Sequence, residues 1–421
     1  MLAPMKPVLR RILWLGLALV ALAGAGAAIR LDRWHVPDPI PSAIGAPADV
    51  AIGPTGQDQT DALQSALDNL QLGQRLMLSP GTYSVSRVLT VSREQVVISG
   101  YGATFVATNP DQQAIVMNGR NSTLVGLTLR GVGTQRLETA TSAKVVVDGE
   151  GIQVLDVTIQ GGASAGIFVS RGSSIALIGD KVSGTLADGI HITGGSHDVL
   201  VQDSSVTATG DDMVGIVSYE RDGAPTRNIY VTGNYLAGNA WGRGVAVVGS
   251  ADVTVVGNWV EGVQKAAAIM VAQEDGYRTM DPTNVLIASN MIADDQNATQ
   301  PGNSRMATGH AAIDVNTGSG SVRGIQVIGN QITRTRFDGF RAQGNICGAG
   351  IGNNRFGAIG GTPIALLYRN CTAEQFTCGG NTLDGAALPV PSGCSGGGAT
   401  QVAGADASRL PQVRSSLRRA P

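Results

Sequence analysis

The chain has 421 residues, including 58 glycines; 4% of the residues are aromatic, 15% are charged, and the formal net charge is −2. This balance offers no basic surface for nucleic acid, so we expect no nucleic-acid partner. The glycines also lack the strand, loop and helix context of a phosphate-binding motif, which argues against a nucleotide site of that kind.

The first segment, residues 1–30, predicts an export signal or a membrane anchor. Lys6, Arg10 and Arg11 precede residues 12–29, which carry no charge and end on small residues. A cleavable signal peptide and an uncleaved single span share these features. Either would place the rest of the chain outside the cytoplasm, in the periplasm or the extracellular space. The prolines of residues 31–47 then indicate an extended linker.

Residues 58–70 predict an amphipathic helix, because Leu63, Ala66, Leu67 and Leu70 fall on one helical stripe. We expect this helix to cap the apolar end of a solenoid.

Residues 48–395 repeat short apolar strands at a spacing of mostly about 22 to 32 residues, with one step near 44. One strand series begins at residues 166, 189, 214, 245, 269, 313, 340 and 364. A second series begins at residues 152, 199, 229, 253, 285 and 325, so each coil carries at least two strands. Such strands bury an apolar face only by stacking, which predicts an all-β, single-stranded right-handed parallel β-helix. Recurring Gly-Asn or Ser-Asn pairs, as at Gly233-Asn234, mark its turns.

The C-terminal region contains all of the cysteines, namely Cys347, Cys371, Cys378 and Cys394. An even number in an exported chain favours disulfides over a zinc site, and the connectivity stays open. Cys347 and Cys371 lie about one coil apart, which suits a bridge between stacked coils. Residues 396–421 have the composition of a disordered tail.

The most informative feature is an alignment of three coil turns, each followed by an apolar strand. It brings Asp188, Asp212 and Arg243 into one column, with Asp211 beside Asp212. Neighbouring coils lie about 4.8 Å apart, so these carboxylates would be close neighbours, and their repulsion should raise at least one pKa. Glycoside hydrolysis needs one protonated and one ionised carboxyl group. The alternative is turn chemistry, because Asp before Gly is common where strands begin; this applies most to Asp188 alone and to Asp338.

These turns resemble motifs of the polygalacturonases, the pectin-hydrolysing β-helix glycosidases. Residues 209–218, Thr-Gly-Asp-Asp-Met-Val-Gly-Ile-Val-Ser, look like the family's Gly-Asp-Asp strand. Residues 187–190 keep the Asp-Gly of its Asn-Thr-Asp-Gly motif, and residues 242–250 resemble its Gly-His-Gly motif with Arg243 in place of His. The resemblance implies that Asp211 is the general acid and that Asp188 and Asp212 activate water for an inverting attack.

The fold resemblance covers residues 45–385, and residues 60–83 look like the opening of the broader pectate-lyase-like superfamily. The family's Arg-Ile-Lys motif, which contacts the substrate carboxylate, should fall near residues 268–270, where the chain has Ala-Ile-Met. The substrate therefore need not be galacturonan.

Other candidate residues surround this cluster. Period-two alternation turns His191 outward beside the acids, where it either binds sugar or has no role. Arg243 either neutralises a substrate carboxylate or pairs with Asp212. The remaining candidates for substrate binding are Tyr219 and Trp241 as stacking platforms, and Asp314 and Arg341 on the outward face, although packing and solubility explain them equally well.

We expect an enzyme, a glycoside hydrolase cleaving an extracellular polysaccharide such as one with uronic acid units, as a monomer without cofactor or metal. A polysaccharide lyase or uronate epimerase is the second possibility, with Arg243 as base or charge neutraliser and the aspartates as calcium ligands or proton handlers. The third is a non-catalytic β-helix that binds polysaccharide.

Overall fold

The structure is a computed structural model that describes residues 49–296, 308–370, 375–397 and 404–412. They all belong to one compact unit of the chain, Pro41–Val413. The predicted export segment and proline-rich linker lie outside these residues. In the part of the chain that the structure describes, no helix is long and apolar enough to span a membrane.

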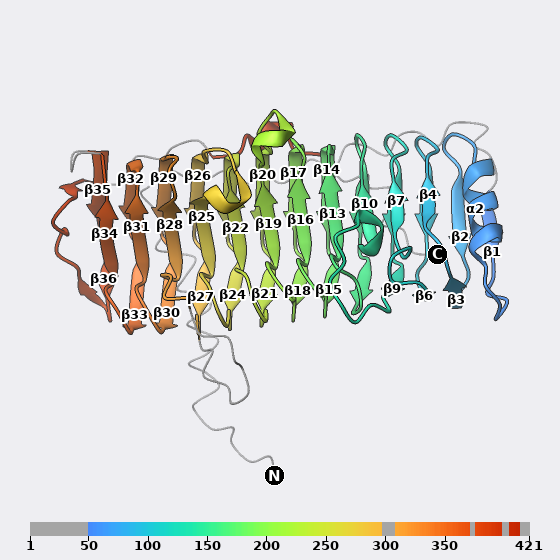
Figure 1. Ribbon diagram of the computed structural model, residues 1–421, viewed down its shortest axis with the longest axis horizontal. Coiled ribbons are helices and arrows are strands. Elements are labelled where there is room, and N and C mark those ends of the chain that lie inside the picture. The colour runs from blue at the N-terminus through green and yellow to red at the C-terminus, as the bar shows by residue number, and fades with distance from the viewer. Residues whose placement is uncertain (1–48, 297–307, 371–374, 398–403, 413–421) are drawn as a thin grey trace, which may run out of the picture. The chain divides into compact units, whose positions relative to one another are not determined.

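The described residues wind into a parallel β-helix whose coils each add one strand to three long sheets, here named A, B and C (Figure 1). The 14 described strands of sheet A are β1 (Val50–Ile52), β2 (Arg75–Leu78), β5 (Val97–Ser99), β8 (Thr123–Val125), β11 (Gln153–Leu155), β14 (Ser173–Ile178), β17 (His197–Gln202), β20 (Arg227–Thr232), β23 (Ala251–Val256), β26 (Thr283–Ala288), β29 (Val322–Ile328), β32 (Ile346–Gly352), β35 (Phe376–Gly379) and β38 (Ser395–Gly396).

Sheet B contains, among the described residues, β3 (Gly81–Val85), β6 (Ala103–Ala107), β9 (Thr128–Arg130), β12 (Thr158–Gln160), β15 (Lys181–Ser183), β18 (Ser205–Thr207), β21 (Tyr235–Ala237), β24 (Trp259–Glu261), β27 (Met291–Ala293), β30 (Gln331–Thr335), β33 (Arg355–Ile359), β36 (Thr382–Leu383) and β37 (Ala386–Ala387). The pair β36 and β37 is antiparallel and ends the sheet.

Sheet C contains, in the same described ranges, β4 (Leu89–Val91), β7 (Ile115–Met117), β10 (Val145–Val147), β13 (Ile167–Ser170), β16 (Ile190–Thr193), β19 (Val214–Val217), β22 (Val245–Val248), β25 (Ile269–Gln273), β28 (Ile313–Thr317), β31 (Phe340–Gly344) and β34 (Ile364–Tyr368). The described helices are α2 (Thr60–Asn69) and the short 3₁₀ turns η1 (Ala140–Ser142), η2 (Glu220–Asp222), η3 (Asp275–Tyr277) and η5 (Ala407–Arg409).

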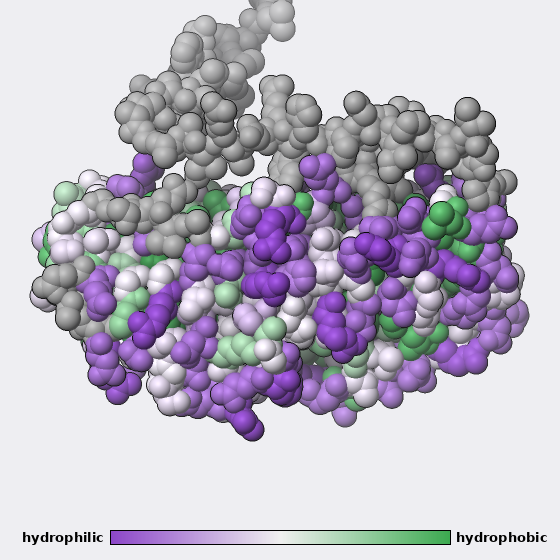
Figure 2. Space-filling view, turned by 90° about the horizontal axis from the view of Figure 1, so that it is seen from above, coloured by the Kyte–Doolittle hydropathy of each residue, from purple (hydrophilic) through white to green (hydrophobic). Residues whose placement is uncertain are grey.

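Inward-facing Ile and Val side chains stack in register and fill the interior. In sheet C, Ile167 pairs with Ile190 and Ile190 with Val214, and all three side chains are fully buried. Each such burial contributes about 1.5 to 3 kcal/mol. The two predicted strand series are sheets C and A, and sheet B is a third strand per coil that the sequence pattern left undefined. The outer face seen in Figure 2 is mostly hydrophilic, with small apolar patches.

Helix α2 caps the first coil, as predicted. Leu63 and Leu67 are buried in the solenoid core, and Ala66 packs against it from a partly buried position. The helix begins where Asp58 Oδ1 accepts hydrogen bonds from the backbone N–H and the hydroxyl of Thr60. In Figure 1 it lies at the blue end of the stack, and it packs beside β4.

The Gly-Asn and Ser-Asn turns join sheets A and B. They bend the chain from one sheet to the next, and their asparagines also connect neighbouring coils. The left-handed φ belongs to the residue before the asparagine, for example +66° at Gly233 and +54° at Ser289. The asparagines themselves are buried and form a column in which each side-chain amide donates to the next Oδ1, at 2.9 to 3.1 Å. The asparagine column comprises Asn234, Asn258, Asn290, Asn330, Asn354 and Asn381.

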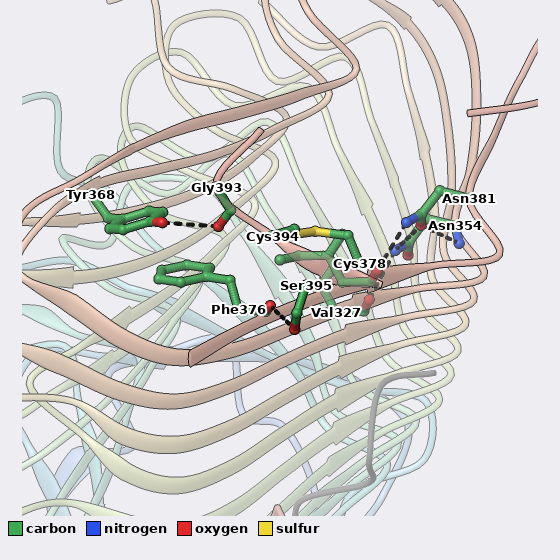
Figure 3. Close-up of a disulfide and its surroundings, with 10 residues drawn as sticks. Val327, Asn354, Tyr368, Phe376, Cys378, Asn381, Gly393, Cys394 and Ser395 are labelled. Atoms are coloured by element: carbon green, nitrogen blue, oxygen red, sulfur yellow. Dashed lines mark hydrogen bonds between the residues drawn. A yellow bond between two sulfur atoms is a disulfide. The ribbon is translucent and has the colours of Figure 1, made fainter. Parts of the chain in front are cut away.

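The C-terminal end of the described solenoid is closed by covalent and aromatic contacts. A disulfide joins Cys378 and Cys394 beside the last asparagines of the column, and Tyr368 stacks on Phe376 with 4.0 Å between ring centroids (Figure 3). Cys347 is also disulfide-bonded. Cys371, which we expected to lie one coil away from Cys347, falls outside the described residues.

Residues 404–412 differ from the predicted disordered tail, because they lie against sheet A in defined contacts. The backbone N–H of Ala405 donates to Thr254 Oγ1, Arg409 pairs with Asp198 at 3.0 Å, and Gln153 donates to the carbonyl of Gln412 at 3.0 Å. Leu410 is buried there. The composition of this segment is that of a loop, but polar groups on sheet A satisfy its backbone.

Candidate active site

The turns between sheets B and C carry the predicted site. Asp188, Asp212 and Arg243 occupy equivalent positions of successive turns, because Gly189 N donates to Asp212 O and Met213 N donates to Arg243 O, each at 2.9 Å. The strands that follow, β16, β19 and β22, lie side by side in the middle of the stack (Figure 1). The register therefore aligns these residues in one column, as the sequence predicts.

Three carboxyl groups converge at this point. One oxygen from each of Asp188, Asp211 and Asp212 lies within 4.8 Å of the other two. Asp211 has the most exposed side chain, at 23%, against 13% for Asp188 and 7% for Asp212. The backbone N–H of Asp212 donates to Asp188 Oδ1 at 3.0 Å, which fixes the first two acids relative to each other.

Burial and mutual repulsion favour a proton on this cluster. Burial raises the pKa of Asp211 above its ordinary value and the charge of Asp188 adds to the rise, while Arg136 and Arg243 oppose it. Burial also raises the pKa of Asp212 well above its ordinary value, against the nearby charge of Arg243. A carboxyl group that keeps its proton near neutral pH is what general acid catalysis requires.

His191 belongs to the cluster. Its Nδ1 lies 2.5 Å from Asp188 Oδ2, and its ring stacks on Phe168 with centroids 5.5 Å apart and an interplanar angle of 8°. The stacked ring and the carboxylate fix the imidazole on the outward face of sheet C. The histidine predicted to face the acids thus has a direct partner among them.

Gly215 gives the acids their space. It pairs with His191 in the neighbouring strand, so its missing side chain would point to the same outward face. A Cβ at this position would lie 3.2 Å from Asp188 Oδ2 and 3.3 Å from His191 Nδ1. Because these distances are tight, any side chain here would press on the carboxylate and the imidazole.

Arg243 is held by two acids. Its Nε lies 3.0 Å from Asp212 Oδ1, its backbone N–H donates to the same oxygen at 2.6 Å, and its Nη1 lies 3.5 Å from Glu274 Oε1. Burial opposes its charge, but Asp212 and Glu274 together raise the pKa of Arg243 above its ordinary value. The predicted pairing with Asp212 is therefore present, and these contacts favour Arg243 as a charge neutraliser over Arg243 as a base.

A second arginine reaches the cluster from a distant loop. Arg136, in the β9–β10 connection, places Nη1 2.8 Å from Asp211 Oδ2, and its side chain is 50% exposed. Sequence reasoning missed this residue, because 75 positions separate it from Asp211. The only sequence signal is the unusual length of the connection between residues 130 and 145. Gly215 and Glu274 were also missed.

Two hollows flank the acids along sheet C. One, of about 390 Å³, is lined by residues that include Arg136, Phe168, Asp188, His191 and Tyr219. The other, of about 140 Å³, is lined by residues that include Trp241, Arg243, Lys265, Glu274 and His310. Asp212 stands between Asp188 and Arg243 in the column, so the cluster lies between two spaces that extended substrate could occupy.

The predicted stacking platforms each carry a cation on one face. The guanidinium of Arg221 lies 4.1 Å from the ring centroid of Tyr219, and Lys265 Nζ lies 2.7 Å from that of Trp241. Both aromatic residues line a hollow beside the acids, Tyr219 the larger and Trp241 the smaller. A sugar ring would have to use the opposite face of either ring or displace the cation.

Asp314 and Arg341 follow Met270 on the outward column of sheet C, but they pair with each other. Asp314 is fully buried, accepts from Ala311 N and Asn316 Nδ2, and lies 2.7 Å from Arg341 Nη2. The expectation that Asp314 contacts substrate is wrong for this arrangement, because its carboxylate is enclosed and fully paired. Arg341 is 16% exposed and donates to Gly309 O.

The three acids also have the spacing of a metal-binding group. However, Arg136 and Arg243 already lie at ion-pair distance from Asp211 and Asp212. Two positive charges next to three carboxylates leave little net charge to attract a divalent cation. The cluster fits a shared proton better than it fits calcium.

Comparison with known proteins supports the fold. A family model described as "Right handed beta helix region" matches residues 113–276. The catalytic unit of the GH87 α-1,3-glucanase from Streptomyces thermodiastaticus is similar in structure, with a TM-score of 0.54 and 16% identity over 84% of this chain and 72% of that one. The A-module of the Azotobacter vinelandii mannuronan C-5 epimerase AlgE6 has a TM-score of 0.57 and 16% identity over 79% of this chain and 96% of that one.

The DFA-IIIase from Arthrobacter chlorophenolicus, in complex with GF2, has a TM-score of 0.56 and 13% identity over 80% of this chain and 93% of that one. A search of curated proteins found no match. At these identities the similarity shows the fold, and the chain is a right-handed parallel β-helix, as predicted.

Proposed function

We propose that the protein is a glycoside hydrolase that cleaves an extracellular polysaccharide by acid/base catalysis with Asp188, Asp211 and Asp212. The observation that carries this proposal is the convergence of three carboxyl oxygens within 4.8 Å of one another, on an outward face and between two hollows. A structural turn would not need stacked acids, because their repulsion costs stability. Their arrangement is explained by a reaction that needs both a proton donor and a proton acceptor.

The assignment of roles follows from exposure and hydrogen bonding. Asp211 is the most exposed of the three acids and has a raised pKa, so it protonates the leaving glycosidic oxygen. Asp188, oriented by His191 and by Asp212 N–H, takes the proton from the attacking water, and Asp212 holds that water in place. General acid and base groups typically contribute about 10² to 10⁴ in rate.

The stereochemistry is open to a direct test. The polygalacturonase resemblance implies inversion, whereas the oxygens within 4.8 Å lie nearer to the separation of about 5 to 5.5 Å typical of retaining enzymes than to the about 6.5 to 9.5 Å of inverting ones. Proton NMR of freshly released product identifies the anomer first formed and decides between the two.

The structural neighbours support a glycan as substrate by analogy. Their names describe an α-1,3-glucanase, a mannuronan epimerase and a DFA-IIIase bound to GF2. The same fold therefore carries sugar chemistry in several proteins, although a fold alone does not assign a reaction. Export of the chain by residues 1–30 would give it access to such polymers, and N-terminal sequencing of the mature protein shows whether they are removed.

The test is a panel of plant and bacterial polysaccharides incubated with wild-type protein and with Asp211→Asn. We expect new reducing ends with the wild type and none with the variant. Asp338→Asn is the matched control, because Asp338 occupies the equivalent turn before β31 and its Oδ1 accepts from Thr362 N, away from the cluster. If Asp211→Asn keeps turnover, the hydrolase proposal fails; if no glycan is cleaved but one binds equally to both proteins, a non-catalytic binding β-helix is the better explanation.

A lyase or epimerase is the second candidate, favoured by the short contact between His191 and Asp188 beside the larger hollow. A histidine held by a carboxylate is suited to remove a proton from a sugar carbon. A lyase would release an unsaturated uronate that absorbs in the ultraviolet. An epimerase would exchange the uronate C5 hydrogen with deuterated water, and a hydrolase would do neither.

A further inference from the structure

The β9–β10 loop, residues 131–143, extends over the next coils and is fixed there. Gly133 N donates to Gly162 O at 2.7 Å, and Leu137 N donates to Ser164 Oγ at 2.7 Å. Asp211 lies in the turn before β19, three coils beyond the start of β10, a distance of about 14 Å at the usual coil spacing. The loop therefore forms one wall of the larger hollow, and it places Arg136 beside the acids.

The guanidinium of Arg136 pairs with two acids, Asp211 and Glu138. Nη1 lies 2.8 Å from Asp211 Oδ2, and Nε lies 3.4 Å from the highly exposed Glu138. The side chain is half exposed and lines the hollow of about 390 Å³. An arginine presents five N–H donors in a planar fork, which matches a carboxylate in a two-point contact. Arg136 thus has donors to offer to an anion in the hollow.

The ion pair between Arg136 and Asp211, as it stands before substrate binds, is unfavourable for catalysis by Asp211. A general acid must carry a proton, and a guanidinium beside it stabilises the ionised form. The charged groups that face Asp211 are Arg136 from the β9–β10 loop, Asp188 from the preceding turn, Asp212 from its own turn, and Arg243 from the turn before β22. Arg243 is held by Asp212 and Glu274 and is only 20% exposed, so Arg136 is the cation that can leave.

We propose that Arg136 is an exchangeable counter-ion: the carboxylate of a uronic acid unit in the larger hollow takes the guanidinium from Asp211, which then gains a proton and becomes the general acid. The inference rests on the proposed hydrolase function and assigns its substrate to the uronate-containing glycans. Arg136 remains a cation throughout, and the sugar carboxylate replaces that of Asp211 as its partner. Asp211 takes its proton from solvent and later passes it to the leaving oxygen as the glycosidic C–O bond breaks.

The exchange explains how the site selects its substrate. Only an anionic sugar can replace Asp211 as the partner of the guanidinium, so a neutral glycan in the same hollow would leave Arg136 in place, where it lowers the pKa of Asp211. The residues 268–270 lack the basic side chains of the family that this region resembles. In this chain the cation comes from a different loop and faces the other side of the acids.

The test is calorimetric titration of the full-length protein with tetragalacturonate, tetramannuronate and tetraguluronate, and with cellotetraose as neutral probe, in two buffers of different ionisation enthalpy. For at least one oligouronate we expect uptake of up to one proton per bound ligand near neutral pH. Arg136→Gln should weaken that binding at least tenfold and abolish the uptake, and Arg136→Lys should restore part of both. Arg120→Gln is the matched control, because Arg120 is similarly exposed and pairs with Glu150 on the surface.

Kinetics on the cleaved glycan completes the test. Arg136→Gln should raise KM for the uronate-containing substrate and move the basic limb of the kcat/KM profile to higher pH, since Asp211 loses a neighbouring cation; a purely structural role would not move this limb. Oligouronate binding without proton uptake, or cleavage of a neutral glycan unchanged by Arg136→Gln, overturns the exchange and leaves the hydrolase proposal intact. Arg136-dependent binding with proton uptake but without cleavage of any glycan retains the exchange and overturns the hydrolase.

Discussion

Two columns of stacked polar residues run through this β-helix, and the same coil spacing has opposite consequences in the two columns. In the asparagine column each amide is both donor and acceptor, so every coil satisfies the next, and the side chains are buried. In the column of Asp188 and Asp212 the stacked groups are all acceptors when ionised, and they need arginines and a proton to coexist. The solenoid therefore stabilises a column when its chemistry is self-complementary and creates reactivity when it is not.

Placing an amide in the column of Asp188 and Asp212 should have the largest effect, a loss of catalytic rate. Asp188→Asn retains an oxygen for Asp212 N–H but cannot accept a proton from water, so we expect kcat on the cleaved glycan to fall about 10³-fold. The melting temperature should stay the same or rise, because a like charge is removed. Steady-state kinetics and thermal unfolding measure the two effects, and a fall in both activity and stability would contradict the comparison.

Placing an acid in the asparagine column should damage stability instead. Asn290 Nδ2 donates to Val255 O and to Asn330 Oδ1, and an aspartate at this position would turn both contacts into repulsion between acceptors. We expect Asn290→Asp to lower the free energy of unfolding by about 3 kcal/mol in denaturant titrations. Asn69→Asp on the exposed end of α2 is the control; it also removes an amide donor, to Ser65 O, but water can replace this exposed contact, so the loss should be much smaller.

Asp180 lies on the line of the asparagine column, two coils before Asn234 and with Ser204 between them. Its Oδ1 accepts from Val157 N, while its Oδ2 is buried without a hydrogen-bond partner among the described residues. Burial raises the pKa of Asp180 well above its ordinary value, so its stabilising contribution is complete below the unfolded pKa and is lost as pH rises through the folded one.

We therefore expect Asp180→Asn to stabilise the protein by about 1 to 2 kcal/mol at neutral pH and by less near pH 4. The new amide would donate to the preceding coil, as Asn234 does to Val201 O. Unfolding free energies measured across this pH range test it, with the exposed Asp203→Asn as the control. A gain that does not depend on pH would show that Asp180 is not protonated in the fold.

The smallest predicted effect comes from crowding the acidic column without changing its charge. Gly215→Ala places a Cβ 3.2 Å from Asp188 Oδ2, so the carboxylate and His191 must shift by a few tenths of an ångström. We expect kcat/KM to fall about tenfold, equivalent to about 1.4 kcal/mol, with little change in stability. Ala246 occupies the next position of the same outward column, and Ala246→Gly serves as the reference for a change of one methyl group there.

The sequence predicts the elements that depend on local periodicity. The strands of sheets A and C and the capping helix follow from short-range periodicity, and the alignment of Asp188 with Asp212 follows from the repeat between neighbouring coils. The sequence does not define sheet B, because strands such as Lys181–Ser183 contain a single buried apolar residue, which is too few to show alternation. The asparagines read as turn formers, since a sequence pattern does not distinguish an exposed amide from a buried hydrogen-bonded column.

Contacts between distant coils account for what sequence reasoning missed in the candidate site. Arg136 meets Asp211 only because a long loop crosses several turns, and no spacing rule connects the two positions. Asp314 looked exposed by alternation, but its pairing with Arg341 buries it. Alternation assigns the face on which a side chain lies, whereas its exposure depends on what the neighbouring coils and loops place over it.

The segment 404–412 has a consequence for how the solenoid comes apart. A stack of coils with contacts only between neighbours can fray from either end, one repeat at a time. This segment bonds to Thr254, Asp198 and Gln153, which belong to coils that do not touch one another directly. Opening any of these coils thus also disturbs contacts made elsewhere along the stack. The tail links the repeats into a more cooperative unit, so truncation before residue 404 should broaden the unfolding transition rather than only lower its midpoint.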